Sequence, residues 1–164
     1  MGTRGVLNEA HDAAMKIYLA ARYSRAEEMR IHAGVLERLG FQVTSRWITG
    51  VFDGPPLTVG AWGDLEDVRR ADGLILFAET PGDGNYSRGG YHVEFGLAYA
   101  MGKKIFVVGE RENIFHYLPD VQHFKNLAEV ITALRFDFAH RPELAEGLNR
   151  ENPSKTQGGN KPHA

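Results

Sequence analysis

Residues 79–102 of this 164-residue chain read ETPGDGNYSRGGYHVEFGLAYAMG, and they follow a short apolar run at 73–78. The apolar run predicts a buried strand, and the regular apolar spacing from Val93 to Met101 predicts a helix. Several glycines lie between the two, and they allow backbone amides to approach a ligand closely. This order of strand, glycine-rich loop and helix predicts a ligand site at the carboxyl edge of a parallel sheet.

The charged centre of this segment is Glu94. We expect it in the first turn of the helix, where unpaired N–H groups and the helix dipole favour an ionised carboxylate. A carboxylate that is held ionised can act as a nucleophile. The alternative is that Glu94 only supplies a favourable charge to the helix start.

The composition limits the class of protein. With 43% hydrophobic and 24% charged residues, the chain is long enough for one buried core and short for two ordinary domains. A net charge of -2 gives no general attraction to nucleic acid or to an anionic membrane. No cysteine is present, and no run approaches the roughly 18 apolar residues of a membrane span. We therefore expect a cytoplasmic protein that binds a small molecule and uses neither a cofactor nor a metal.

Short apolar runs alternate with helical patterns along the rest of the chain. This alternation predicts an α/β fold, a flavodoxin-like or Rossmann-like doubly wound parallel sheet of about five strands with helices on both faces. We expect one domain at 15–140, a flexible extension at 1–14, and a disordered tail at 141–164, which is polar and rich in Pro and Gly. Strands are expected at 17–21, 41–45, 73–77, 104–108 and 121–124, and helices at 25–39, 64–71, 91–101 and 127–134.

Three segments carry motifs in a fixed order: KIYLAARYSRAEEM at 16–29, DLEDVRRADGLILFAET at 64–80 and GGYHVEFGLAYAMGKKIFVVG at 89–109. Together they resemble the nucleoside 2-deoxyribosyltransferase family and its relatives, the 2'-deoxynucleoside 5'-phosphate N-hydrolases. The resemblance implies that Glu94 attacks the anomeric carbon of a sugar. It also implies that Asp64 handles the leaving base and that Tyr18 lies near the nucleophile.

The chemistry of an N-glycosidic bond agrees with these implied roles. Cleavage passes through an oxocarbenium-like state, so a carboxylate such as Glu94 on the face opposite the base can stabilise or capture the sugar. The departing base needs a proton, which Asp64 can supply if its pKa is raised. The alternatives are that Asp64 is an N-cap of the helix it opens and that Tyr18 is plain strand core.

The residues just before the nucleophile indicate a phosphate. Transferases that act on free nucleosides resemble one another in carrying an aspartate a few residues before it, whereas this chain has Ser87 and Arg88 there. A hydroxyl, a guanidinium and the amides of Gly89 and Gly90 at a helix start all favour an anion. The loop therefore predicts a nucleotide rather than a nucleoside substrate.

Other side chains are weaker candidates for the site. Arg22 and Arg25 follow the first strand and can add positive charge at the same edge. Trp47 either stacks on a base or only covers the sheet. His92 does not predict a metal, because positions two apart on a helix diverge and no third ligand is nearby in the sequence.

The sequence thus predicts an N-glycosidase that hydrolyses a (2'-deoxy)nucleoside 5'-monophosphate to a free base and a sugar phosphate. The alternatives are a nucleoside 2-deoxyribosyltransferase and a non-catalytic nucleotide-binding sensor module.

Residues 110–120, ERENIFHYLPD, add an expectation about assembly. Their apolar cluster is typical of an interface, or else caps the edge of the sheet. The resemblance implies a homodimer with shared active sites, in which a polar residue of this segment reaches the ligand of the partner. The candidates are Asn113, His116 and Tyr117.

Overall fold

The computed structural model describes residues 14–51, 56–80 and 89–139. The expected tail at 141–164 lies outside the described residues, and so does the expected extension except for residue 14. Among the described residues, no helix combines the length and the apolar character that crossing a membrane requires.

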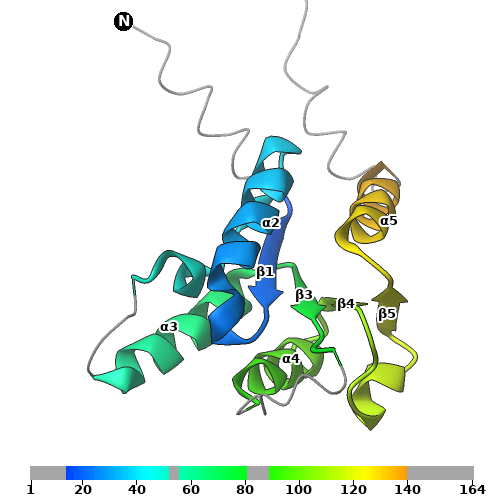
Figure 1. Ribbon diagram of the computed structural model, residues 1–164. Helices are drawn as coiled ribbons and strands as arrows, with labels where there is room; N and C mark the ends of the chain where they lie inside the picture. The colour runs from blue at the N-terminus through cyan, green and yellow to red at the C-terminus, as the bar shows by residue number, and fades with distance from the viewer. Residues whose placement is uncertain (1–13, 52–55, 81–88, 140–164) are drawn as a thin grey trace, which may run out of the picture.

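Five parallel strands form one sheet in the order β2-β1-β3-β4-β5 (Figure 1). This is the flavodoxin-like strand order, so the predicted fold class is confirmed. Every residue of β3 is buried, as its continuous apolar character predicts. The strands are β1 (Lys16–Ala20), β2 (Gln42–Val43), β3 (Gly73–Phe77), β4 (Lys104–Val108) and β5 (Val121–Phe124).

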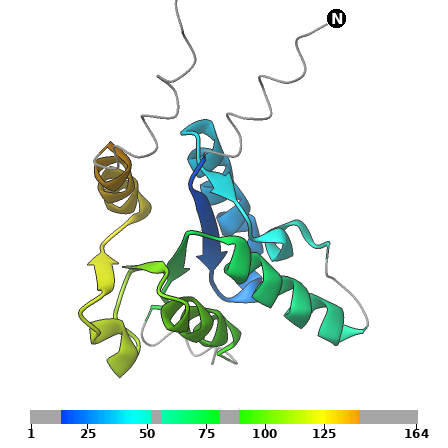
Figure 2. The ribbon, with the colours of Figure 1, turned by 180° about the vertical axis from the view of Figure 1, so that it is seen from behind.

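In the described part of the chain, three α-helices and three 3-10 turns connect the strands, and a further helix, α5, follows β5. The opposite views in Figures 1 and 2 show α2 over one face of the sheet, and α3 with α4 over the other. The helices are α2 (Ala26–Arg38), α3 (Leu57–Arg70), α4 (Gly90–Ala100) and α5 (Leu127–Ala139). The turns are η1 (Tyr23–Arg25), η2 (Arg46–Thr49) and η3 (Ile114–Tyr117).

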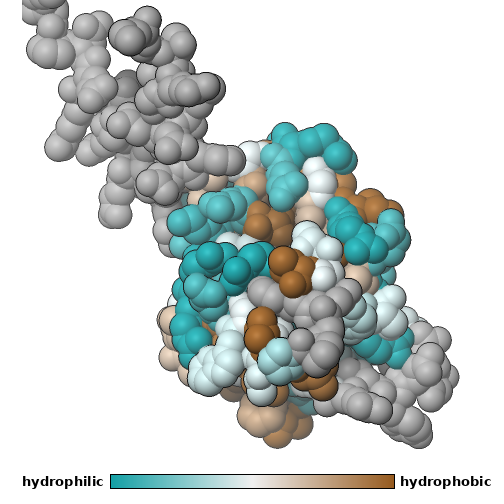
Figure 3. Space-filling view, turned by 90° about the vertical axis from the view of Figure 1, so that its left-hand side faces the viewer, coloured by the Kyte–Doolittle hydropathy of each residue, from teal (hydrophilic) through white to brown (hydrophobic). Residues whose placement is uncertain are grey.

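Two helices begin earlier than the sequence predicts. Helix α3 begins at Leu57 rather than at Asp64, and α4 begins at Gly90. The early part of α3 gives no periodic signal because its large apolar residues, Leu57 and Trp62 among them, are exposed. Figure 3, which views the molecule from the α3 side, shows the hydrophobic side chains of that face as separate patches among hydrophilic ones.

Candidate active site

Tyr18, Asp64 and Glu94 come from three elements that pack together. Tyr18 lies in β1, Asp64 in the middle of α3 and Glu94 in α4, and these helices contact each other and β1. Among the residues that the structure describes, each of these side chains has one buried polar atom without a hydrogen-bond partner: the Tyr18 hydroxyl, Asp64 Oδ1 and Glu94 Oε2. Because nearly all buried polar atoms in folded proteins are hydrogen-bonded, three such atoms from neighbouring elements indicate a place for a ligand.

Burial controls the ionisation of these carboxyls. Burial, followed by the charge of Asp64, raises the pKa of Glu94 to about 8. Burial, followed by the charge of Asp67, raises the pKa of Asp64 to about 6, although Arg46 acts in the opposite direction. Near neutral pH the two carboxyls, Asp64 and Glu94, therefore hold about one proton between them.

The sequence predicts that Glu94 lies in the first turn of the helix and is ionised, and the structure contradicts both parts of this prediction. Glu94 is the fifth residue of α4, so it lies beyond the unpaired N–H groups of the first turn. The Tyr18 hydroxyl has no partner at full hydrogen-bond geometry, yet it is close enough to lower the pKa of Glu94 against the larger effect of burial. Tyr18 is also fully buried, so it serves as strand core and as a neighbour of the carboxyl. The alternative of Asp64 as an N-cap is also wrong, because α3 begins seven residues before it.

Asp67 lies one turn after Asp64 on α3 and is fully buried. Its carboxylate accepts hydrogen bonds from Arg46 N–H at 2.9 Å, Arg46 Nε at 2.8 Å and Arg70 Nη2 at 2.9 Å. These bonds fix η2 against α3. The next residue in η2, Trp47, is 7% exposed and donates its indole N–H to Leu19 O at 2.9 Å. Its burial favours the interpretation that Trp47 covers the sheet.

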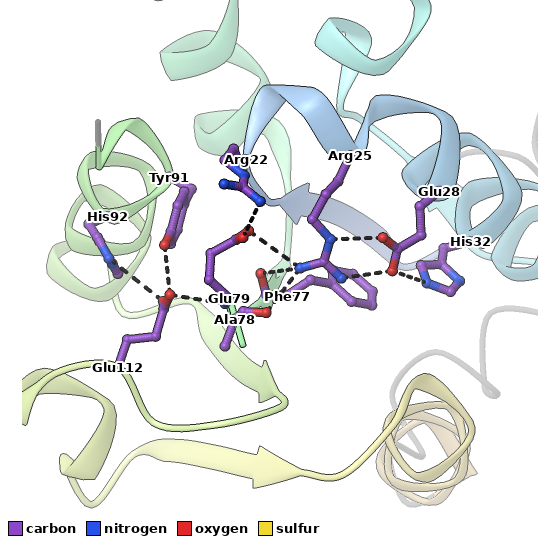
Figure 4. Close-up of polar contacts among 10 residues, drawn as sticks. All are labelled: Arg22, Arg25, Glu28, His32, Phe77, Ala78, Glu79, Tyr91, His92 and Glu112. Carbon is purple, nitrogen blue, oxygen red and sulfur yellow. Dashed lines mark hydrogen bonds and ion pairs between the residues drawn. The ribbon is translucent and has the colours of Figure 1, made fainter. Parts of the chain in front are cut away.

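The guanidinium of Arg25 forms hydrogen bonds to three other residues of the protein (Figure 4). Its Nε and Nη2 donate to the carboxylate of Glu28 at 2.8 and 2.7 Å, and its Nη1 donates to Phe77 O and Ala78 O at 3.0 Å each. The guanidinium thus ties the start of α2 to the end of β3. This arrangement does not fit the expected contact with a substrate.

Arg22 lies at the same edge and forms an ion pair with Glu79, with 2.7 Å between Nη2 and Oε2. The side chains of Arg22 and Glu79 are 20% and 14% exposed. Sequence reasoning missed Glu79, although its position two residues after a buried strand is a signal for the functional edge of a parallel sheet. Any phosphate that binds Arg22 has to compete with this carboxylate.

Glu112 is a second acidic residue that sequence reasoning missed. Its Oε1 accepts hydrogen bonds from Glu79 N–H at 3.0 Å and from the Tyr91 hydroxyl at 2.7 Å. Its Oε2 lies 3.7 Å from His92 Nε2 (Figure 4). One carboxylate therefore links Glu79, two residues after β3, to the first turn of α4.

The three residues expected to reach a partner's ligand differ in accessibility. His116 has no exposed surface and accepts a hydrogen bond at Nδ1 from Glu112 N–H at 3.3 Å, so it does not fit that role. Asn113 uses its side-chain oxygen to cap η3, accepting from Phe115 N–H at 2.9 Å. Tyr117 is 67% exposed and remains accessible.

His92, Glu112 and His116 place one possible ligand atom each within 4.8 Å of the others. Their hydrogen bonds do not fit a metal. His116 Nδ1 faces a backbone N–H, and His92 Nδ1 faces Asn113 Nδ2 at 3.4 Å, whose orientation is set because Asn113 Oδ1 accepts from Phe115 N–H. Each Nδ1 thus faces a donor, which assigns the proton to Nε2. Metal-binding histidines show the reverse, with the second ring nitrogen donating to an acceptor.

Two glycines, Gly89 and Gly90, lie at the start of α4. Gly89 adopts φ 75°, a left-handed conformation that side chains disfavour. No atom of the described residues lies within 4 Å of a Cβ atom added at Gly90. The N–H groups of a helix start bind anions. Ser87 and Arg88, the other expected phosphate ligands, lie outside the described residues.

Comparisons with known proteins agree with this fold. Neither a protein-family model nor a curated protein matches the sequence. Among solved structures, a 2-deoxyribosyltransferase from Bacillus psychrosaccharolyticus matches with a TM-score of 0.57 and 24% identity over 70% of this chain and 89% of that one. The Clostridium botulinum CMP N-glycosidase BcmB matches with a TM-score of 0.48 and 23% identity over 74% of this chain and 98% of that one. The expected resemblance is thus confirmed for the fold, which this chain shares with a 2-deoxyribosyltransferase.

Proposed function

We propose that this protein is an N-glycosidase that hydrolyses a (2'-deoxy)nucleoside 5'-monophosphate to a free nucleobase and a (deoxy)ribose 5-phosphate. The observation that supports the proposal is the group of unpartnered polar atoms on Tyr18, Asp64 and Glu94. Two carboxyls that share one proton suit a reaction that needs one carboxylate and one carboxylic acid.

In the proposed mechanism, the Glu94 carboxylate attacks the anomeric carbon while the bond from that carbon to the base nitrogen breaks. Asp64 gives its proton to the departing base. Water then hydrolyses the glycosyl ester on Glu94, and the Asp64 carboxylate takes a proton from that water. In the free protein the proton rests mainly on Glu94, whose pKa is the higher of the two. Substrate binding has to move it to Asp64, and positive charge that develops on the sugar beside Glu94 favours this transfer.

The proposed phosphate site lies at the start of α4. Arg22 and the amides of Gly89 and Gly90 supply the described part of it, and Ser87 and Arg88 are proposed to complete it. The phosphate would replace Glu79 as the partner of Arg22. A nucleotide substrate and a chain without cysteine suit the cytoplasmic location that we propose.

The shared fold supports a second candidate, a transferase that exchanges bases between 2'-deoxynucleosides. One experiment separates the candidates: the protein is incubated with ribo- and deoxyribonucleoside monophosphates and with the free nucleosides, and the products are separated by chromatography. A hydrolase releases base from a single nucleotide, whereas a transferase forms product only when a second base is added. Binding without any product would support the sensor module instead.

We also propose that the active unit is a homodimer. Ile114, Phe115 and Tyr117 in η3 are 78%, 57% and 67% exposed, an apolar group that a second copy would cover. Tyr117 is then the candidate for contact with the partner's ligand. Mixing inactive Glu94→Ala with an inactive Tyr117→Ala variant should restore activity through hybrid dimers. A fully active protein that sediments as a monomer would rule this out.

A further inference from the structure

Glu112 follows β4, and its side chain is 16% exposed. A single oxygen, Oε1, receives hydrogen bonds from two elements: the backbone N–H of Glu79 after β3 and the hydroxyl of Tyr91 in α4. Figure 4 shows the Glu112 carboxylate between these groups, with His92 on its other side. The carboxylate therefore sets how α4 starts relative to the end of β3.

The contact at Tyr91 bears directly on Glu94. The two residues are three apart on one helix, so they lie on neighbouring positions of the same face. Tyr91 is 4% exposed and its ring is packed, so a bond that fixes its hydroxyl also fixes the rotation of the first turn. The rotation of that turn determines where the Glu94 carboxyl points.

Glu112 is itself positioned by contacts with His116 and His92. Its backbone N–H donates to Nδ1 of the fully buried His116, whose ring centroid lies 5.2 Å from that of Phe95 in α4. His92 presents its protonated Nε2 toward Glu112 Oε2 at 3.7 Å. The groups that face Glu112 from the neighbouring elements are thus donors, which suit an acceptor in a fixed position.

We propose that Glu112 is a positioning residue that holds α4, and with it Glu94, in the geometry needed for attack on the sugar. The inference rests on the proposed function, in which Glu94 is the nucleophile. Glu112 does not touch the reacting atoms. It acts through Tyr91 and Glu79, and its loss would remove the hydrogen bonds that join these two residues and leave the helix start free to shift.

Turnover of the substrate nucleotide tests this inference. Glu112→Ala should lower kcat by about 100-fold, because a shift of a catalytic group by about 1 Å has such an effect. KM should change little. Glu112→Gln keeps a carbonyl oxygen that accepts from both donors, so it should retain most of the activity. Tyr91→Phe should lower kcat less than Glu112→Ala and should have no further effect when the two are combined. The exposed Glu110 in the same segment gives a matched control, and Glu110→Ala should behave as the unmutated protein.

Backbone amide hydrogen exchange in residues 91–95 supplies a second readout that needs no substrate. Exchange should be faster in Glu112→Ala and near normal in Glu112→Gln. If Glu112→Ala keeps both normal kcat and normal exchange, the inference is overturned, whatever Glu94 does. If no nucleotide yields base, the proposed function fails and the exchange result alone decides whether Glu112 holds α4. If Glu112→Ala does not fold, Tyr91→Phe decides: unchanged kcat and unchanged exchange in that variant would overturn the inference.

Discussion

Helix α3 carries two aspartates, Asp64 and Asp67, that lie one turn apart and differ in their partners. Asp67 is fully buried, and its carboxylate accepts three hydrogen bonds from two arginines. Asp64 is less buried, yet one of its oxygens has no partner and its pKa is raised to about 6 by burial and then by the charge of Asp67. The difference supports the proposal that Asp64, rather than Asp67, takes part in the chemistry.

Glu112 and Glu94 differ in the hydrogen bonds that join them to other elements. Glu112 receives two hydrogen bonds at one oxygen and ties β3 to α4. Glu94 has a buried oxygen without a partner and a pKa raised to about 8, chiefly by burial. Asp67 and Glu112 Oε1 therefore join elements of the fold around Asp64 and Glu94, whereas Glu112 Oε2 is, like Glu94 Oε2, a buried oxygen with no hydrogen-bond partner among the described residues.

The strongest test of this contrast replaces Glu94, the proposed nucleophile. Glu94→Gln should lower base release by at least about 10³-fold, because a covalent nucleophile is lost. At pH 7 the variant should unfold at a higher temperature, because the folded protein keeps a proton on Glu94 that the unfolded chain has lost, and glutamine removes this cost. The matched control is Glu110→Gln, which should leave both measurements unchanged. Near-normal base release by Glu94→Gln would show that the assignment is wrong.

Substitution of Asp64 should affect activity, whereas substitution of Asp67 should affect stability. Asp64→Asn should lower kcat by about 10²- to 10⁴-fold through loss of the general acid, with little change in the free energy of unfolding. Asp67→Asn should instead lower the free energy of unfolding by about 1–3 kcal/mol, because it disturbs a buried hydrogen-bonded group. Parallel kinetics and urea unfolding measure both effects. If Asp67→Asn stays folded and its kcat falls as much as that of Asp64→Asn, the proposed division between a catalytic Asp64 and a structural Asp67 is contradicted.

Removing the third unpartnered group should have a smaller effect. Tyr18→Phe should lower kcat by about tenfold, the equivalent of one hydrogen bond of about 1.4 kcal/mol to the reacting carboxylate. The pKa of Glu94 should rise further, because the hydroxyl lowers it in the unmutated protein. In a pH profile of kcat/KM, the fall in activity on the alkaline side should therefore occur at higher pH in Tyr18→Phe than in the unmutated protein. An unchanged profile would mean that Tyr18 serves only as part of the hydrophobic core.

The smallest effect concerns stability against pH. The pKa of Glu94 is about 8 in the folded protein, above its ordinary value of 4.5, so the folded state keeps the proton longer as pH rises. The free energy of unfolding should therefore fall between about pH 5 and about pH 8 more steeply in the unmutated protein than in Glu94→Gln. Denaturant unfolding at the two pH values measures the difference. Equal slopes would show that Glu94 does not hold a buried proton.

Much of the fold follows from local patterns. The apolar runs predict all five strands, and the buried run at 73–77 matches β3 residue for residue. Glu94 can be found in the sequence because glycines and a helix pattern surround it. The start of α3 cannot, since its first turns carry exposed apolar residues with no buried stripe.

The hydrogen bonds of Asp67 and Glu112 could not be predicted because their partners are distant in the sequence. Asp67 binds Arg46, 21 residues away, and Glu112 binds Glu79, 33 residues away. The protonation of Glu94 could not be predicted for the same reason. Its pKa depends on burial by elements that only the folded chain brings together.

The most direct test of the central claim is mass spectrometry of the protein during turnover. The nucleotide that is cleaved fastest is replaced by its 2'-fluoro analogue, in which the electron-withdrawing fluorine disfavours the oxocarbenium-like state and slows release of a glycosyl–enzyme ester. We predict a protein whose mass is increased by the fluorinated sugar phosphate, with the adduct on the peptide that contains Glu94 and none in Glu94→Gln. Release of base without an adduct on Glu94, or an adduct on another residue, would contradict the claim that Glu94 is the nucleophile.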